Sequence, residues 1–446
     1  MIIDCSTTLA ELVAIPSVNP MGRAVSGPEF FEHRLTDYLE RLFERLAIPA
    51  QRQPIAPLRD NIIVRLDAEI PPDRGGPLLL FEVHQDTVPV DGMTIEPWTP
   101  IVRDGRLYGR GACDVKGGMA AMVAAVARLA HERPKNRANI VLACTVNEEN
   151  GFTGATGLTQ LWKLNGASGA SPSPHVDESL RDTHRVSERR DHVIFPRSPD
   201  AAVVAEPTRL DVVVAHKGVV RWRCHTHGRA AHSSRPEAGD NAIYRMARVV
   251  SALERYQREL LAAAPAHPLC GRPTLSVGTI AGGLSVNTVP DLATIEIDRR
   301  LAPGEEPDAA YRQVIDYLAA AIDDPDSSGR VSPRRDASLG VARPHDAARS
   351  ITHEPPFMQS FGLADAANRE IAQRLVAAVR SVRGTVSQIG VPFGTDAAAI
   401  ARAGVPSVVF GPGSIEQAHT ADEWISLAEV EHAAEVLYHL ASDWSR

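Results

Sequence analysis

Short apolar runs alternate along the chain with longer segments whose apolar residues recur at helical spacing. The runs at 61–66, 78–83, 139–146 and 201–205 have the length of buried strands. Residues 117–129 are small and apolar and predict a buried helix. A capping box at Ser26-Gly27-Pro28-Glu29 predicts an amphipathic helix from there to about Ala47. Apolar strands that alternate with helices indicate an α/β fold, with a mostly parallel sheet sandwiched by helices.

The middle of the chain has a pattern of its own. Strand-like and helix-like segments follow one another at 212–226, 241–263, 274–280, 292–297 and 307–322, with a last strand near 348–352. This order, β-α-β-β-α-β, predicts an inserted ferredoxin-like α+β domain. The α/β pattern resumes with a helix at 364–380, a strand at 407–410 and a helix from Leu427. We therefore expect a domain formed by 1–211 and 354–446, interrupted by a second domain at 212–353.

Two polar stretches, 165–199 and 323–345, are rich in residues typical of loops and are interpreted as surface insertions. The 446 residues carry a formal net charge of −8, which argues against a nucleic-acid surface. The five cysteines are scattered and favour a reducing cytoplasm over a disulfide framework. Residues 1–20 lack the basic and apolar regions of a signal peptide, and 119–130 is too short to span a membrane.

Acidic residues and histidines stand directly after the predicted strands, where open α/β sheets build their sites. They are His84 and Asp86, the adjacent Glu148 and Glu149, Glu206, and His419, joined by Asp114 in a glycine-rich turn before a helix. Imidazoles and carboxylates that converge on one sheet edge form a site for a divalent metal ion. Each motif alone is also typical of a solvated turn, a charged loop or a helix cap; their joint occurrence at strand ends favours the metal site.

In these motifs the chain resembles the M20 family of metallopeptidases. The matching segments are His84-Gln85-Asp86-Thr87-Val88-Pro89, Tyr108-Gly109-Arg110-Gly111 through Gly118, Asn147-Glu148-Glu149, Glu206-Pro207-Thr208, Ala231-His232-Ser233-Ser234 and Gln417-Ala418-His419-Thr420. They occur in the family's order over nearly the whole chain. The resemblance implies a zinc-exopeptidase-like catalytic domain with an inserted lid and dimerisation domain.

The resemblance also implies a role for each residue. Asp114 would bridge two metal ions, with His84 and Glu206 completing one site and Glu149 and His419 the other. Glu148 would be the general base, and Asp86 would orient His84. The bridging aspartate of the family is often followed by a cis peptide bond, here Asp114-Val115. The ions would be Zn²⁺, although Co²⁺ and Mn²⁺ are also suited to such ligands.

Further residues are implied on the substrate side. His232 would stabilise the oxyanion, in dimeric members across the subunit interface, whereas a histidine in a serine-rich turn is the simpler interpretation. Asn287 and Arg299 match positions that hold a substrate carboxylate, for which an arginine fork is suited; Arg299 could instead form a surface ion pair. Gly394-Thr395-Asp396 resembles another substrate-side loop of the family. The lid resemblance implies a homodimer.

The predicted function is hydrolysis of the amide bond of a small N-acyl amino acid, with acetylornithine deacetylase-like members as the nearest resemblance in the segment from Phe410 to His419. A succinyl-diaminopimelate desuccinylase, an aminoacylase, and a carboxypeptidase or dipeptidase use the same chemistry and remain alternatives. A catalytically silent metal-binding scaffold and a protein-interaction module are the non-enzymatic alternatives, and the filled ligand and base positions favour the enzyme. We expect neither nucleic acid nor membrane as a partner.

Overall fold

The computed structural model describes residues 3–166, 193–323 and 351–444. The chain divides into two compact units. Unit 1 contains 1–215, 364–390 and 395–446, and unit 2 contains 216–363 together with 391–394. The sequence placed these boundaries at 211/212 and 353/354.

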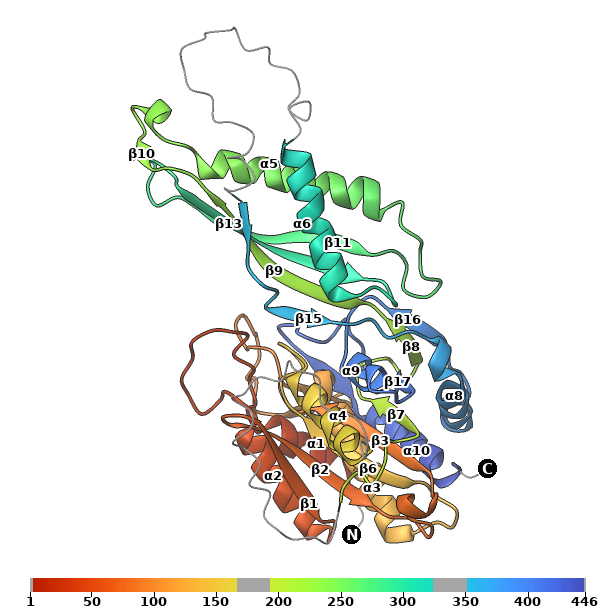
Figure 1. Ribbon diagram of the computed structural model, residues 1–446. Coiled ribbons are helices and arrows are strands. Elements are labelled where there is room, and N and C mark those ends of the chain that lie inside the picture. The colour runs from red at the N-terminus through yellow and green to blue at the C-terminus, as the bar shows by residue number, and fades with distance from the viewer. Residues whose placement is uncertain (1–2, 167–192, 324–350, 445–446) are drawn as a thin grey trace. The chain divides into compact units, whose positions relative to one another are not determined.

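Unit 1 is built on an eight-stranded sheet with the order β1-β2-β6-β3-β7-β17-β8-β16 (Figure 1). Its strands are β1 (Ala50–Ala56), β2 (Arg59–Leu66), β3 (Leu78–His84), β6 (Asn139–Thr145), β7 (Ala201–Val204), β8 (Val212–His216), β16 (Gln388–Val391) and β17 (Ser407–Val409). The central strands β6, β3, β7 and β17 are parallel. Every residue of β3 and β6 is buried, as their continuous apolar sequences predict.

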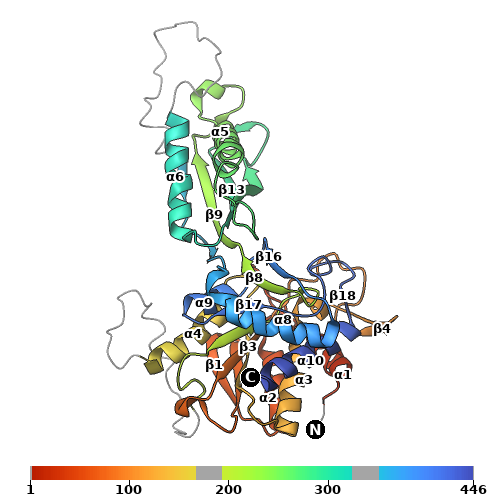
Figure 2. The same ribbon diagram turned by 90° about the vertical axis from the view of Figure 1, so that its right-hand side faces the viewer.

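Helices cover both faces of this sheet. On one face lie α1 (Cys5–Val13), α2 (His33–Arg45), α3 (Gly117–Glu132), α8 (Arg369–Arg383) and α10 (Leu427–Ser442), which share one apolar core with the strands. Figure 2 shows α8 and α10 next to each other on this face, and α10 packs against α3. The helices α4 (Thr153–Gly166) and α9 (Ala397–Arg402) pack together against the same sheet. The α/β class predicted from the sequence is confirmed.

A small antiparallel sheet in unit 1 joins β4 (Ile101–Arg103), β5 (Arg106–Tyr108) and β18 (Trp424–Ser426). It brings the chain just before the glycine-rich turn beside the chain just after His419, although more than 300 positions separate the paired residues Tyr108 and Trp424.

Unit 2 follows the predicted order β-α-β-β-α-β. Its sheet has the order β11-β13-β9-β14, and the elements are β9 (Gly218–His227), α5 (Ala242–Arg255), β11 (Thr274–Gly282), β13 (Leu292–Leu301), α6 (Pro307–Asp323) and β14 (Ile351–His353). The helices α5 and α6 pack together on one face (Figure 2), over a core that includes Trp222 and Ile297. Shorter strands β10 (Ala231–His232), β12 (Thr288–Val289) and β15 (Met358–Ser360) complete the unit.

The predicted helix from Ser26 is wrong at its start, because α2 begins only at His33. Phe31 has a φ of 66°, outside the right-handed helical region. The preceding backbone is engaged elsewhere: Val18 N donates to Glu29 O at 2.9 Å, and Phe31 N donates to Val18 O at 3.0 Å. Long-range backbone pairing therefore replaces the capping box.

The single strand expected at 212–226 is also wrong, since it is divided into β8 and β9 at Lys217. The first part pairs within the large sheet, and the second pairs with β13. The insertions at 165–199 and 323–345 lie mostly outside the described residues, as does the start of the last strand expected near 348–352. No helix within the described ranges is long and apolar enough to cross a bilayer.

Candidate metal centre

The carboxyl ends of the parallel strands in unit 1 bring the predicted ligands together. His84 is the last residue of β3, Glu148 and Glu149 follow β6, and Glu206 follows β7. His419 lies in the loop after β17, and Asp114 lies in the turn that leads into α3. This convergence follows from parallel strand order, because parallel strands end at the same sheet edge.

Asp114 stands between the two histidines. Its Oδ1 is 3.1 Å from His84 Nε2, and its Oδ2 is 3.3 Å from His419 Nε2. His419 Nε2 is also 3.3 Å from Glu149 Oε1, and His84 Nε2 is 4.0 Å from Glu206 Oε1. One carboxylate thus presents one oxygen to each histidine, which is the arrangement that a bridging ligand requires. The expected cis peptide bond Asp114-Val115 is present.

Two overlapping groups of side chains have ligand atoms within 4.8 Å of one another: His84 with Glu148 and Glu206, and His84 with Asp114 and Glu149. The first group includes Glu148, which the sequence assigned as the base. The separate contacts of His84 and His419 with Asp114 use both Asp114 oxygens and add the second imidazole, so they define the centre better than either group.

The electrostatics of this cluster call for a cation. Burial and the neighbouring Glu206 raise the pKa of Glu148, and burial and Asp114 raise the pKa of Glu149 and of Glu206. Burial opposes the charge on His419, but hydrogen bonds to Asp114 and Glu149 raise its pKa to about 11. Carboxylates that cannot all ionise together are stabilised as anions by a metal ion. Their oxygen and nitrogen donors fit a hard or borderline divalent ion.

The contacts that Asp86 makes differ from those expected from the sequence. His84 Nδ1 lies 2.9 Å from the main-chain oxygen of Asp86, whereas the Asp86 carboxylate is 3.8 Å from that nitrogen. The carboxylate instead accepts the backbone N–H groups of Glu148 and Glu149, both at 3.1 Å. Asp86 therefore orients His84 through its carbonyl and positions the two adjacent glutamates through its side chain.

A pair of buried carboxyl groups lies beside the centre; Glu82 was missed in the sequence, whereas Asp396 belongs to the expected substrate-side loop. Glu82 and Asp396 are both buried, and Thr145 Oγ1 donates to each of them, at 2.5 and 3.3 Å. Burial is the largest cause of the raised pKa of Glu82 and of Asp396, which reaches about 7. A glutamate inside the apolar run 78–83 was a readable signal, because an isolated buried charge is costly. Glu423, discussed below, was also missed.

Four of the expected substrate-side residues belong to unit 2. His232 is exposed and its Nδ1 accepts the backbone N–H of Ser234 at 3.2 Å. Asn287 is exposed, and Arg299 is fully buried and paired with Glu305 at 2.8 Å. Gly394 also lies in unit 2, whereas Thr395 is buried in unit 1, where its hydroxyl accepts the N–H of Ala397.

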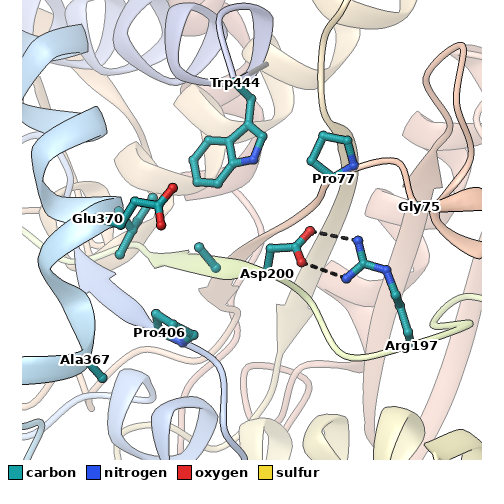
Figure 3. A pocket seen from close by; sticks show the side chains of 10 residues that line it. Gly75, Pro77, Arg197, Asp200, Ala367, Glu370, Pro406 and Trp444 are labelled. Carbon is teal, nitrogen blue, oxygen red and sulfur yellow. Dashed lines mark hydrogen bonds and ion pairs between the residues drawn. The ribbon is translucent and has the colours of Figure 1, made fainter. Parts of the chain in front are cut away.

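A cavity of about 470 Å³ lies at the opposite, amino-terminal edge of the unit 1 sheet (Figure 3). Its lining includes Pro77, Asp200 and Pro406, which precede β3, β7 and β17. Arg197 pairs with Asp200 through two hydrogen bonds of 2.8 Å and donates to Gly76 O at 2.7 Å. The Arg197 guanidinium thus stabilises this loop, and the predicted metal ligands lie at the other edge of the sheet.

The chain was compared with known proteins. The sequence profile of peptidase family M20/M25/M40 matches residues 80–443. An acetylornithine deacetylase of Myxococcus xanthus is 28% identical over 408 residues, 90% of each chain, and a probable carboxypeptidase of Emericella nidulans is 27% identical over 97% of this chain and 88% of its own. An M20 family metallo-carboxypeptidase structure from Sulfolobus solfataricus aligns over 99% of both chains, with a TM-score of 0.69 and 16% identity.

Proposed function

This chain belongs to peptidase family M20/M25/M40 and is a metal-dependent hydrolase of amide bonds, and we propose that it cleaves an N-acyl amino acid at a centre of two divalent metal ions. The observation that carries the proposal is the position of Asp114 between His84 and His419, with one carboxylate oxygen near each imidazole.

The two ions would be held by His84, Asp114 and Glu206 on one side and by Asp114, Glu149 and His419 on the other. Zn²⁺ suits these nitrogen and oxygen ligands, and Co²⁺ or Mn²⁺ could replace it. When bound, such a pair lowers the pKa of water from 15.7 toward about 7 and polarises a carbonyl group.

Glu148 would act as the general base. It would take one proton from the attacking water and return it to the leaving nitrogen as the C–N bond breaks, so that an acid and a free amine are released. Burial and the neighbouring Glu206 raise the pKa of Glu148 above the ordinary value of a glutamate. The Asp86 carboxylate fixes its main chain at 3.1 Å, which limits its movement between the two steps.

Unit 2 would supply substrate contacts. Because His232 Nδ1 accepts a hydrogen bond from Ser234, its proton is on Nε2, the form that could donate to an oxyanion. Asn287 is exposed and could donate to a substrate carboxylate. Arg299 would first have to leave its buried pair with Glu305. Gly394 and Thr395 would shape the substrate side through the backbone, since the Thr395 side chain is buried.

An acetylornithine deacetylase-like activity is the first candidate, supported by the 28% identity to that enzyme. A carboxypeptidase is the second, because a probable carboxypeptidase is 27% identical over nearly the same length. A desuccinylase, an aminoacylase and a dipeptidase complete the substrate classes to be tested.

The test combines metal content with a substrate screen. Purified protein is analysed for bound ions, stripped with a chelator, reloaded with Zn²⁺, Co²⁺ or Mn²⁺, and assayed with N-acetylornithine, N-succinyl-diaminopimelate, other N-acyl amino acids and dipeptides. We expect two ions per chain and activity that returns with metal. Two bound ions without turnover of any substrate would instead indicate a silent scaffold.

A homodimer through unit 2 is part of the proposal. Leu284 and Val286 are 98% and 99% exposed, next to the sheet-edge strand β11, where Ile280 is also exposed. Exposed apolar side chains beside a free strand edge favour association with a second copy. Light scattering should give a dimer mass that Leu284→Asp with Val286→Asp reduces to a monomer mass; a monomeric native protein would remove this part.

The cytoplasm remains the proposed location. All five cysteines are buried thiols, which suits a reducing compartment.

A further inference from the structure

Glu423 is a fully buried acidic residue that belongs neither to the ligand set nor to the general base. It lies four positions after His419 and directly before β18. Its backbone carbonyl accepts the N–H of Gly109 at 3.0 Å, and the next residue pairs with Tyr108 in β5. The small sheet therefore fixes Glu423 against the start of the turn that carries Asp114.

The Glu423 carboxylate accepts four hydrogen bonds from that turn. Oε1 accepts the backbone N–H groups of Cys113 and Asp114, at 2.8 and 3.0 Å. Oε2 accepts Arg110 Nη1 at 2.6 Å and the N–H of Gly111 at 3.0 Å. Each oxygen thus serves two donors, and all four donors point at a single buried anion.

The turn is an irregular π-helical turn, Ala112–Lys116, in which Lys116 N donates to Gly111 O at 2.8 Å. The N–H groups of Gly111, Cys113 and Asp114 donate outside it, to Glu423. Gly111 is left-handed with a φ of 80°, and Asp114 and Val115 have non-helical dihedral angles. Successive N–H groups in such a turn form a concave anion-binding site, and charge-assisted hydrogen bonds are stronger than neutral ones. The side chain of Glu423 therefore supplies what a regular helix would obtain from its own carbonyl groups.

We propose that Glu423 is a positioning residue of the metal centre, which holds the Asp114 backbone so that the two carboxylate oxygens face His84 and His419. The same residue ends the loop that carries His419, so one carboxylate connects the sources of two ligands. This inference rests on the proposed binding of two ions. Partners behind metal ligands typically change metal affinity by about 10–100-fold when they are removed.

The variant Glu423→Gln tests the proposal. Its amide nitrogen would face two N–H donors and lose their hydrogen bonds, while side-chain size is kept. The matched control is Glu429→Gln: Glu429 also accepts a backbone N–H, that of Gly413 at 2.8 Å, and this donor lies outside the Asp114 turn. Zn²⁺ and Co²⁺ affinities are measured by chelator competition, the Co²⁺ absorption spectrum is recorded, and unfolding of the metal-free proteins is followed in parallel.

We expect Glu423→Gln to bind metal about 10–100-fold more weakly and to alter the Co²⁺ spectrum, with Glu429→Gln close to the native protein. Glu423→Asp, which keeps both oxygens on a shorter side chain, should give an intermediate affinity and serves if the glutamine variant does not fold.

Native affinity and spectrum in either Glu423 variant would overturn the proposal, as would an equal loss in Glu429→Gln. If the native protein itself binds no pair of ions, the proposed function fails and this inference fails with it. A native protein with two ions and an unaffected Glu423→Gln would overturn this inference alone.

Discussion

Each unit contains a group of charged side chains, and the two groups lie in different surroundings. On the sheet of unit 2, Arg221 and Arg223 stand directly opposite Asp298 and Glu296 in the β9–β13 pair, at 2.7 and 2.9 Å. At the carboxyl edge of unit 1, Asp114, Glu148, Glu149 and Glu206 are crowded around two imidazoles.

The two groups differ in whether their charges are already balanced by neighbouring groups. In unit 2, Arg221 and Arg223 each have an oppositely charged partner on a partly exposed face, while the other face of the same strands is buried core, so pairing and water balance these four charges. In unit 1 the carboxylates outnumber the imidazoles, and burial and neighbouring carboxylates raise the pKa of Glu148, Glu149 and Glu206. Only this second arrangement requires an additional cation.

The largest expected effect follows from Asp114→Asn. Removal of the one carboxylate that faces both imidazoles should weaken metal binding by more than the roughly 100-fold upper value for residues behind a ligand, and activity should fall with it. Elemental analysis after dialysis, together with assay of the best substrate, measures both. Asp104→Asn, a change at an exposed acid of the same unit, is the control and should be neutral. Retention of both ions in Asp114→Asn would refute the bridging role.

Glu148→Gln should reduce kcat by about 10²–10⁴-fold, because general-base assistance is lost, while two ions stay bound. Glu149→Gln serves as the comparison variant, because the loss of a proposed ligand should reduce both the metal content and kcat. A Glu148→Gln protein with normal kcat would exclude the base assignment. A metal-depleted one would place Glu148 among the ligands, in agreement with its proximity to His84 and Glu206.

Acid should destabilise the protein through His216, the last residue of β8. Burial lowers its pKa to about 4 from 6.5, so the folded state keeps it neutral. Between pH 6.5 and 4 the unfolded chain binds the proton first, and the free energy of unfolding falls by up to about 3 kcal/mol as the pH decreases through this window. Unfolding curves of the native protein and of His216→Gln at pH 7.5 and 4.5 measure the difference. An equal pH dependence in both proteins would contradict it.

The smallest effect is expected at the paired face of unit 2. Glu296→Gln should change the free energy of unfolding by less than about 1 kcal/mol, because its pair with Arg223 is partly exposed. Ile297→Ala, on the buried face of the same strand, should lower the free energy of unfolding by about 2–5 kcal/mol. This variant is the positive control for the unfolding measurement. A loss of several kcal/mol in Glu296→Gln would mean that the surface pairs are structural, and the contrast with unit 1 would be weaker.

Much of the fold was readable in the sequence. The runs at 78–83 and 139–146 became β3 and β6 with nearly the predicted bounds, because a fully buried parallel strand is marked by its own continuous apolar residues. The β-α-β-β-α-β order of unit 2 was readable from a different signal, because one face of β13 and one face of α5 are buried and their apolar residues recur at strand and helix spacing. The helix start at Ser26 failed, since its local capping signal was overridden by backbone bonds to Val18.

The sequence by itself determined which residues stand at the strand ends, and therefore that His84, Asp114, Glu148, Glu149, Glu206 and His419 could meet. Only the tertiary structure decided which Asp114 oxygen faces which histidine, that the Asp86 carboxylate holds the glutamate backbone, and that Glu423 organises the Asp114 turn. The physical reason is distance along the chain. Periodicity and capping encode neighbours a few residues apart, whereas the bond between Asp114 and Glu423 spans 309 positions and exists only after the two loops have packed.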